Sequence, residues 1–153
     1  TNWSKIAGAG SRYSYADNIF ASGFFSAIKT DGTLWSWGDN TYGKLGLGNT
    51  ISRSSPVQVG ALTTWSSLSI NQAENYKSTV NTAVIKTDGT LWAWGSNVTG
   101  SLATGGTTPV RRSSPVQVLS GTSGWTSVSV ICGDASSYYS NLSRSSMLAI
   151  RTS

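Results

Sequence analysis

The feature that most constrains this chain is an internal repeat. Residues 27–38 (AIKTDGTLWSWG) recur as residues 83–95 (AVIKTDGTLWAWG) with one insertion, and SSPVQV occurs at both 54–59 and 113–118. A third repeated segment begins at Trp3, Trp65 and Trp125, so 62 residues separate its first two copies and 60 separate its last two. A period of this length is typical of propeller blades rather than of short solenoid coils.

Each repeat carries signals for β-strands. Asp31 and Gly32 stand between two apolar runs, and an Asp-Gly pair tolerates the positive φ angles of a type I′ turn. We therefore expect a hairpin with strands near residues 24–30 and 33–38. The Trp segment and the Pro-Val-Gln-Val segment add two short strands, with Pro at the start of an edge strand. The repeat unit is thus predicted to be a four-stranded antiparallel sheet.

The second strand of this hairpin alternates between two kinds of side chain. Leu34 and Ser36 share one face while Trp35 and Trp37 share the other, because successive side chains of a strand point to opposite faces. A single sheet cannot bury an aromatic face, whereas stacking against an identical sheet covers it. We expect radial stacking of the sheets, with all seven tryptophans in core positions.

Composition agrees with an all-β chain. Charged residues make up only 11% of the sequence, glycines number 17, and no segment shows apolar residues at helical spacing over three turns. The net charge of +5 is dispersed along the chain, which argues against a nucleic-acid partner. No apolar run is long enough to predict a membrane span.

These repeats resemble the regulator of chromosome condensation repeat family. Residues 38–46 (GDNTYGKLG) match the family's Asn-x-x-Gly-x-Leu-Gly loop, and residues 95–103 (GSNVTGSLA) match it with the last Gly replaced. The resemblance covers essentially the whole chain and implies a β-propeller, which in this family has seven blades. The chain departs from the family pattern because it has no His before the alanine strand and because its units are longer.

The repeat predicts how the chain is organised. We expect one repeat domain over residues 1–153, with blade units at about 3–62 and 65–122 and an incomplete unit at 125–153. This partial β-propeller has about two and a half blades, whereas a closed ring needs about four or more. The chain is therefore either a piece of a longer propeller or one of several copies that complete a ring. In both cases the missing blades are expected partners.

The inventory of reactive side chains argues against an enzyme. The chain has no His and one Cys, so we expect no His-assisted nucleophile, no metal site and no cofactor. A lyase or glycan hydrolase would need a converging pair among Asp17, Glu74 and Asp134, because the other carboxylates are assigned to turns or a loop cap. Residues 38–44 mimic a phosphate loop, but Leu45 replaces the required hydroxyl, which favours a structural turn.

The connections between the Trp strand and the alanine strand differ among units. They take 24, 18 and 24 residues, counted from Trp3, Trp65 and Trp125 to the following alanines. They are predicted to be loops on one rim of the scaffold, and they share a composition of tyrosines with basic residues, which is typical of interface anchors. The predicted binding residues are Arg12, Tyr13, Tyr15, Tyr76, Lys77, Tyr138, Tyr139 and Arg144.

These observations favour a non-catalytic binding or structural module that presents Tyr- and Arg-bearing loops to a protein or glycan. By analogy with phage appendage proteins of the same family, we expect it outside the cell or on a virion surface. The alternative that the resemblance implies is an intracellular guanine-nucleotide exchange factor or a chromatin-associated propeller.

Overall fold

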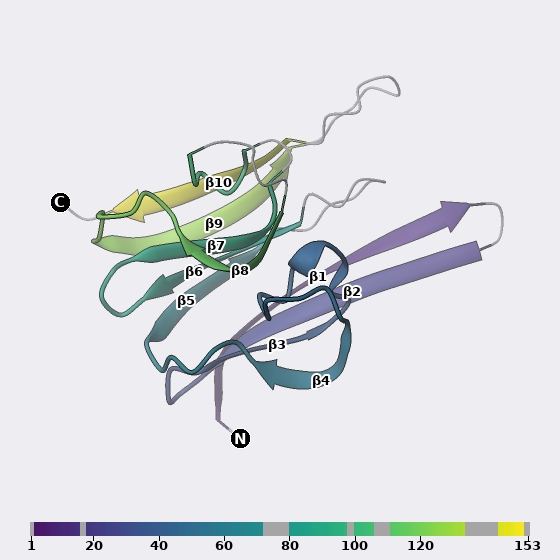
Figure 1. Ribbon diagram of the computed structural model, residues 1–153, viewed down its shortest axis with the longest axis horizontal. Helices are drawn as coiled ribbons and strands as arrows, with labels where there is room; N and C mark the ends of the chain where they lie inside the picture. Colours follow the sequence, from purple (N-terminus) through teal and green to yellow (C-terminus); the bar gives the residue numbers. More distant parts are fainter. Residues whose placement is uncertain are drawn as a thin grey trace.

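The computed structural model describes residues 2–15, 18–71, 80–97, 100–105, 111–133 and 144–151. Its ten strands form three sheets, which lie side by side (Figure 1). The first sheet contains β1 (Trp3–Tyr15), β2 (Asn18–Lys29), β3 (Leu34–Gly38) and β4 (Arg53–Gln58). The second contains β5 (Trp65–Ile70), β6 (Asn81–Lys86), β7 (Leu91–Ser96) and β8 (Arg111–Gln117), and the third contains β9 (Trp125–Gly133) and β10 (Arg144–Arg151).

The two complete sheets have the same topology. Their strands are hydrogen-bonded antiparallel neighbours in chain order, β1-β2-β3-β4 and β5-β6-β7-β8. The third sheet pairs β9 with β10. Within the described residues the only helical segment is the short 3₁₀ helix η1 (Thr41–Gly43). The prediction of an all-β chain with four-stranded antiparallel units is therefore confirmed.

The Asp-Gly hairpins form as predicted, but the expected type I′ turn is wrong. Gly32 N donates to Lys29 O at 3.0 Å, and Lys29 N donates to Thr33 O at 2.9 Å. Gly32 has φ +77°, whereas Asp31 has no positive φ. This is a type I turn followed by a glycine in a G1 bulge. The second unit repeats it, because Gly89 N donates to Lys86 O at 2.9 Å and Gly89 has φ +75°.

The first connection is not a loop but a continuation of two strands. β1 and β2 stay paired as far as Tyr15 opposite Asn18, whereas β3 pairs with β2 only from Phe24 to Ile28. The far part of the β1–β2 hairpin therefore extends past the end of β3 without a third strand, as Figure 1 shows. We call this part, residues 10–15 and 18–23, the hairpin extension.

The sheets pack face to face. One buried cluster joins the first and second sheets through Ile28, Leu34 and Val59 on one side and Trp65 and Trp94 on the other. A second cluster joins the second and third sheets, with Ile85, Leu91 and Ala93 against Val128 and Val130. The hydrophobic core thus consists of the seams between sheets, as the stacking argument predicts.

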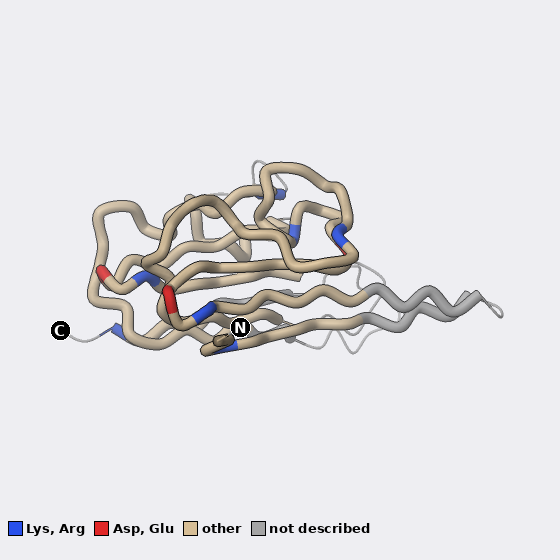
Figure 2. The backbone as a smooth tube through the Cα atoms, turned by 90° about the horizontal axis from the view of Figure 1, so that it is seen from below, with Lys and Arg blue, Asp and Glu red and all other residues tan. Residues whose placement is uncertain are grey.

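Charged side chains are sparse on this framework. Figure 2 shows the described Lys, Arg, Asp and Glu scattered along the tube rather than gathered in one patch. In the part of the chain that the structure describes, no helix is long and apolar enough to cross a membrane.

Candidate functional site

The two faces of each sheet have different roles at the seams. Leu34 and Ser36 in β3 are fully buried and face the second sheet, where Trp92 and Trp94 in β7 face back toward the first. The opposite face of β7, with Leu91 and Ala93, covers the third sheet. The indole-bearing face of a unit therefore packs on the preceding unit.

Trp94 anchors this contact through a loop of the first unit. Its side chain is fully buried, and its Nε1–H donates to Lys44 O at 3.0 Å. Gly46 has φ +73°, and a Cβ there would lie 2.8 Å from Trp94 Nε1. Glycine is needed at position 46 both for its backbone conformation and for the close approach of the indole.

The loop that accepts Trp94 is the one that mimics a phosphate loop. Asn40 is fully buried, and its Oδ1 accepts from Leu45 N at 2.9 Å; in the second unit Asn97 Oδ1 accepts from Leu102 N at 3.3 Å. Gly43 has φ +74°. The repeated amide contact supports the predicted structural role of this loop.

Carboxylates in the described residues serve turns and one ion pair. Asp31 Oδ1 accepts from Thr33 N at 2.9 Å and from Thr33 Oγ1 at 2.6 Å, and these bonds hold the pKa of Asp31 below its ordinary value. The same contacts with Thr90 lower the pKa of Asp88. The roles that the sequence predicted for both residues are confirmed.

Asp39 pairs with a buried cation. Lys44 Nζ lies 2.5 Å from Asp39 Oδ2, and Thr41 donates to Oδ1 through its N and its Oγ1. Burial raises the pKa of Asp39, but the hydrogen bonds from Lys44 and Thr41 outweigh it, so the net pKa is lowered.

The three carboxylates considered for a catalytic pair, Asp17, Glu74 and Asp134, lie outside the described residues. The described residues contain no group of three or more His, Cys, Asp or Glu that could hold a metal ion.

A cluster of two tryptophans and a lysine occurs in both complete units. Trp65 and Trp92 meet edge to face with ring centroids 6.2 Å apart, and Lys86 Nζ lies 3.8 Å from the Trp92 ring centroid. In the first unit Lys29 Nζ lies 3.8 Å from the Trp35 ring centroid, and Trp3 meets Trp35 edge to face. Sequence reasoning missed these cation–π contacts, although a Lys preceding each Thr-Asp-Gly turn was a visible signal.

None of the described sheets covers the two outer faces of the stack. Trp3 is 40% exposed and Phe25, which stacks on Trp37, is 44% exposed, whereas their counterparts in the second unit face the first sheet. At the other end Leu148 and Ile150 are 60% and 58% exposed. The expectation that all seven tryptophans are core residues is therefore wrong for Trp3, because none of the described sheets lies against its face.

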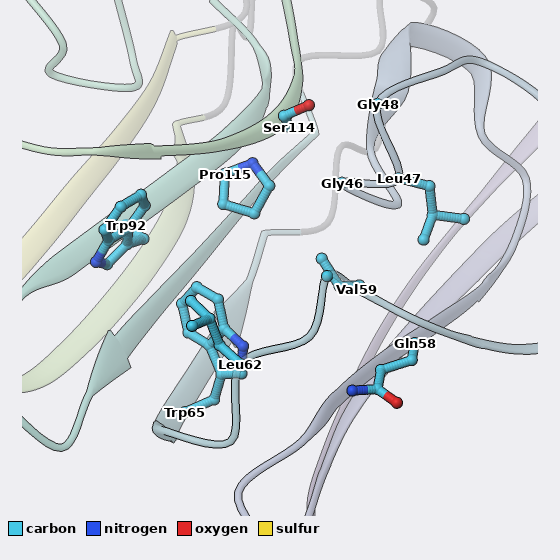
Figure 3. Close-up of a pocket in the computed structure, with 11 residues that line it drawn as sticks. Gly46, Leu47, Gly48, Gln58, Val59, Leu62, Trp65, Trp92, Ser114 and Pro115 are labelled. Carbon is cyan, nitrogen blue, oxygen red and sulfur yellow. The ribbon is translucent and has the colours of Figure 1, made fainter.

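A cavity of about 400 Å³ lies at the seam between the first two sheets (Figure 3). Leu47, Val59 and Leu62 of the first unit form one part of its wall. Trp65, Trp92 and Pro115 of the second unit form another part. We call it the seam pocket. Its residues were not predicted to form a binding site, although the Leu62 position differs between the repeats, a difference visible in the sequence.

The structure describes the backbone of four of the predicted binding residues, Arg12, Tyr13, Tyr15 and Arg144. Arg12, Tyr13 and Tyr15 lie on the hairpin extension, paired with Ala21, Phe20 and Asn18, so their expected position in a loop is wrong. Arg144 is the first residue of β10.

The remaining predicted binding residues are Tyr76, Lys77, Tyr138 and Tyr139, and all four lie outside the described residues.

Four-stranded antiparallel sheets that repeat along a chain and pack face to face define a β-propeller built from repeats. The chain belongs to the regulator of chromosome condensation (RCC1) repeat family, which it matches over residues 31–70 and 88–139. This confirms the resemblance seen in the sequence.

Relatives and solved structures agree with this family. The chain is 33% identical over 111 residues to the human protein "Probable E3 ubiquitin-protein ligase HERC6", covering 71% of the chain and 10% of that protein. It is 31% identical over 94 residues to human "E3 ubiquitin-protein ligase HERC2", covering 61% of the chain and 2% of that protein. The chain thus spans a tenth or less of the length of these relatives.

The fold matches solved propellers at low identity. Human WBSCR16 superposes with a TM-score of 0.56 at 19% identity, and Prp20p from Saccharomyces cerevisiae with 0.54 at 17% identity. Each match covers 69% of this chain and 26% of the solved chain. These likenesses show the fold.

Proposed function

We propose that this chain is a non-catalytic protein-binding module whose hairpin extension contacts the partner. The observation that carries the proposal is that β1 and β2 remain paired to Tyr15 opposite Asn18, beyond the end of β3. Arg12, Tyr13 and Tyr15 lie on this projecting part. Tyr and Arg are enriched in protein interfaces because they offer large contact areas with polar ends.

The solved relatives support a protein rather than a glycan as the partner. One structure report describes the binding properties of Prp20p to Gsp1p and histones, and another describes Kap60 bound to yeast RCC1 (Prp20). Those statements concern the yeast protein. They favour protein recognition as the general use of this scaffold.

The test is a selection of displayed random peptides against the folded chain. Selected peptides are then measured against the triple variant Arg12→Ser, Tyr13→Ser, Tyr15→Ser, and against the control Ile51→Ser, which removes an exposed apolar side chain that belongs to neither strand of the hairpin. The triple variant is expected to lose binding by about tenfold or more while the control keeps it. Peptides that bind all three proteins equally would contradict the proposal. It would also be contradicted if a glycan array, but not the peptide selection, gave ligands whose binding depends on the hairpin.

We also propose that other repeats of this kind cover the outer faces of the stack, whether from the same longer polypeptide or from other copies. Phe25 is 44% exposed on a face whose equivalent in the second unit is covered by the first. The free chain should therefore associate head to tail. Sedimentation should show association of the wild type that is lost in Phe25→Ser, and identical sedimentation of both at every concentration would contradict this.

The proposal further places the module outside the cell or on a virion surface. It is supported by a charged content of only 11% and a surface rich in hydroxyls. Fractionation of the producing cells with an antibody against the chain tests this. The chain should be found in the medium or on particles, and recovery only from the cell interior would contradict it.

Guanine-nucleotide exchange or chromatin association is the second candidate, favoured by the reported binding of Prp20p to Gsp1p and histones. Nucleotide release from Gsp1p and binding to histone octamers distinguish the two. Our main proposal predicts that the chain accelerates no nucleotide release and retains no histones. Catalytic stimulation of release would decide for the second candidate.

A further inference from the structure

The seam pocket contains a buried hydrogen-bond donor that no described residue accepts. Trp65 is 3% exposed, and its Nε1 has no hydrogen-bond partner among the described residues. Figure 3 shows this indole nitrogen on the side of the ring that faces the pocket, which Leu62 also lines. A buried donor without a partner destabilises the fold, so a ligand that supplies an acceptor gains that interaction.

Comparison with the other unit shows why this donor is free. Trp125 occupies the same place in the next repeat, and its Nε1 donates to Thr122 Oγ1, three residues earlier, at 3.4 Å. The residue three before Trp65 is Leu62, whose side chain has no acceptor. The indoles of Trp35 and Trp92 are likewise satisfied by threonine hydroxyls. The change from threonine to leucine therefore leaves one buried indole N–H unpaired and adds an apolar side chain to the pocket wall.

The walls define the chemistry of the ligand. None of the described residues that line the pocket is charged, and most of the wall comes from Leu, Val, Pro and Trp side chains. Leu62 is 45% exposed, so solvent reaches the pocket at this side. A matching ligand is neutral and apolar and carries a strong acceptor.

We propose that the seam pocket binds a proline-containing peptide segment, with a backbone carbonyl of the segment accepting from Trp65 Nε1–H. Proline brings a carbonyl and an apolar ring without an N–H that would be left unpaired against apolar walls. Proline-rich segments are also extended before binding and dock on aromatic-lined grooves at low entropic cost. A sugar ring presents more hydroxyls than the two polar side chains of the described wall, Gln58 and Ser114, can pair with. The proposal deepens the proposed protein-binding function at a surface separate from the hairpin extension.

The experiment titrates the chain with acetyl-hexaproline amide, acetyl-(Gly-Ser)₃ amide and cellohexaose, and follows the indole N–H resonances by NMR. Trp65→Phe assigns the Trp65 signal. Only hexaproline should shift this signal, and Leu62→Thr, which rebuilds the acceptor found at Thr122, should weaken binding by about tenfold or more. Ile51→Thr makes a comparable change at an exposed site outside the pocket and should bind as the wild type does.

Several outcomes overturn the proposal. These are no hexaproline binding by the wild type, equal binding by Leu62→Thr, and a Trp65 shift caused by cellohexaose instead of the peptide. The triple hairpin variant should bind hexaproline normally. Loss of its selected peptides together with intact hexaproline binding separates the two surfaces, so failure of one proposal is distinguishable from failure of the other.

Discussion

The pair Ser26 and Ser36 gives a quantitative test of how closely the two units correspond. The two residues are cross-strand partners in β2 and β3, both are fully buried, and their Oγ atoms are 2.9 Å apart. In the second unit the pair at this register is Ala83 and Ala93, also fully buried. The same seam position is thus filled once by two hydroxyls bonded to each other and once by two methyl groups.

The expected effects follow from hydrogen-bond energetics. Ser26→Ala or Ser36→Ala alone leaves the other hydroxyl buried without its partner and should lower the free energy of unfolding by about 1 to 2 kcal/mol. The double variant leaves no polar group unpaired and copies the second unit. It should therefore cost less than about 1 kcal/mol, which gives a coupling energy of about 1 to 3 kcal/mol.

Urea unfolding followed by tryptophan fluorescence measures these values. Ser54→Ala and Ser55→Ala are the control pair, because both serines lie exposed in β4 and their effects should be small and additive. If the effects of Ser26→Ala and Ser36→Ala simply add, the two hydroxyls do not depend on each other and the assigned equivalence of the seam positions is incorrect.

Two further variants probe the loop that receives Trp94. Gly46→Ala should lower the free energy of unfolding by about 2 to 4 kcal/mol, because it adds a clash with the Trp94 indole to the backbone strain of a positive φ. Gly60 has φ +63° and open space around it, so the control Gly60→Ala should cost only about 1 kcal/mol. Equal melting temperatures of the two variants would contradict this. Asp39→Asn should flatten the pH dependence of stability. Because the pKa of Asp39 is lowered in the folded state, its carboxylate stabilises the fold at pH values above its ordinary pKa of about 3.9, and this stabilisation is lost as the pH falls through the folded-state pKa. The difference in melting temperature between pH 6 and pH 3 should therefore be smaller in Asp39→Asn than in the wild type. An equal difference in both proteins would refute this prediction.

Much of the fold was predictable because the repeated segments can be aligned with one another, and the residues that recur mark the strands and turns. The recurring Asp-Gly pair located the hairpins, and alternation in residues 34–37 separated the two faces of the sheet. The turn type was not predictable, because Asp-Gly suits both a type I′ turn and a type I turn with a G1 bulge. Which one forms depends on the number of residues between the last strand pairs.

The candidate sites were less predictable. The connections at this position take 24, 18 and 24 residues and do not repeat in sequence, so nothing in the comparison indicated that β1 and β2 would continue as a hairpin. The repeated sequence also does not show which unit has another sheet packed on its indole-bearing face. Trp65 is buried because the first sheet covers it, while the equivalent Trp3 is exposed. The unpaired donor of the seam pocket goes with a single difference between the repeats, Leu62 where the next unit has Thr122, and the sequence alone does not show where the Trp65 indole lies.

The central claim is that each unit buries its indole-bearing face on the unit before it. Hydroxyl-radical footprinting of the folded chain with mass spectrometry tests this most directly, by comparing oxidation of Trp3 with that of Trp94 at protein concentrations that keep the chain monomeric. Trp3, which is 40% exposed, should be oxidised readily, and Trp94, which is fully buried, should be protected until the chain unfolds. Comparable oxidation of the two tryptophans in the folded chain would contradict the account.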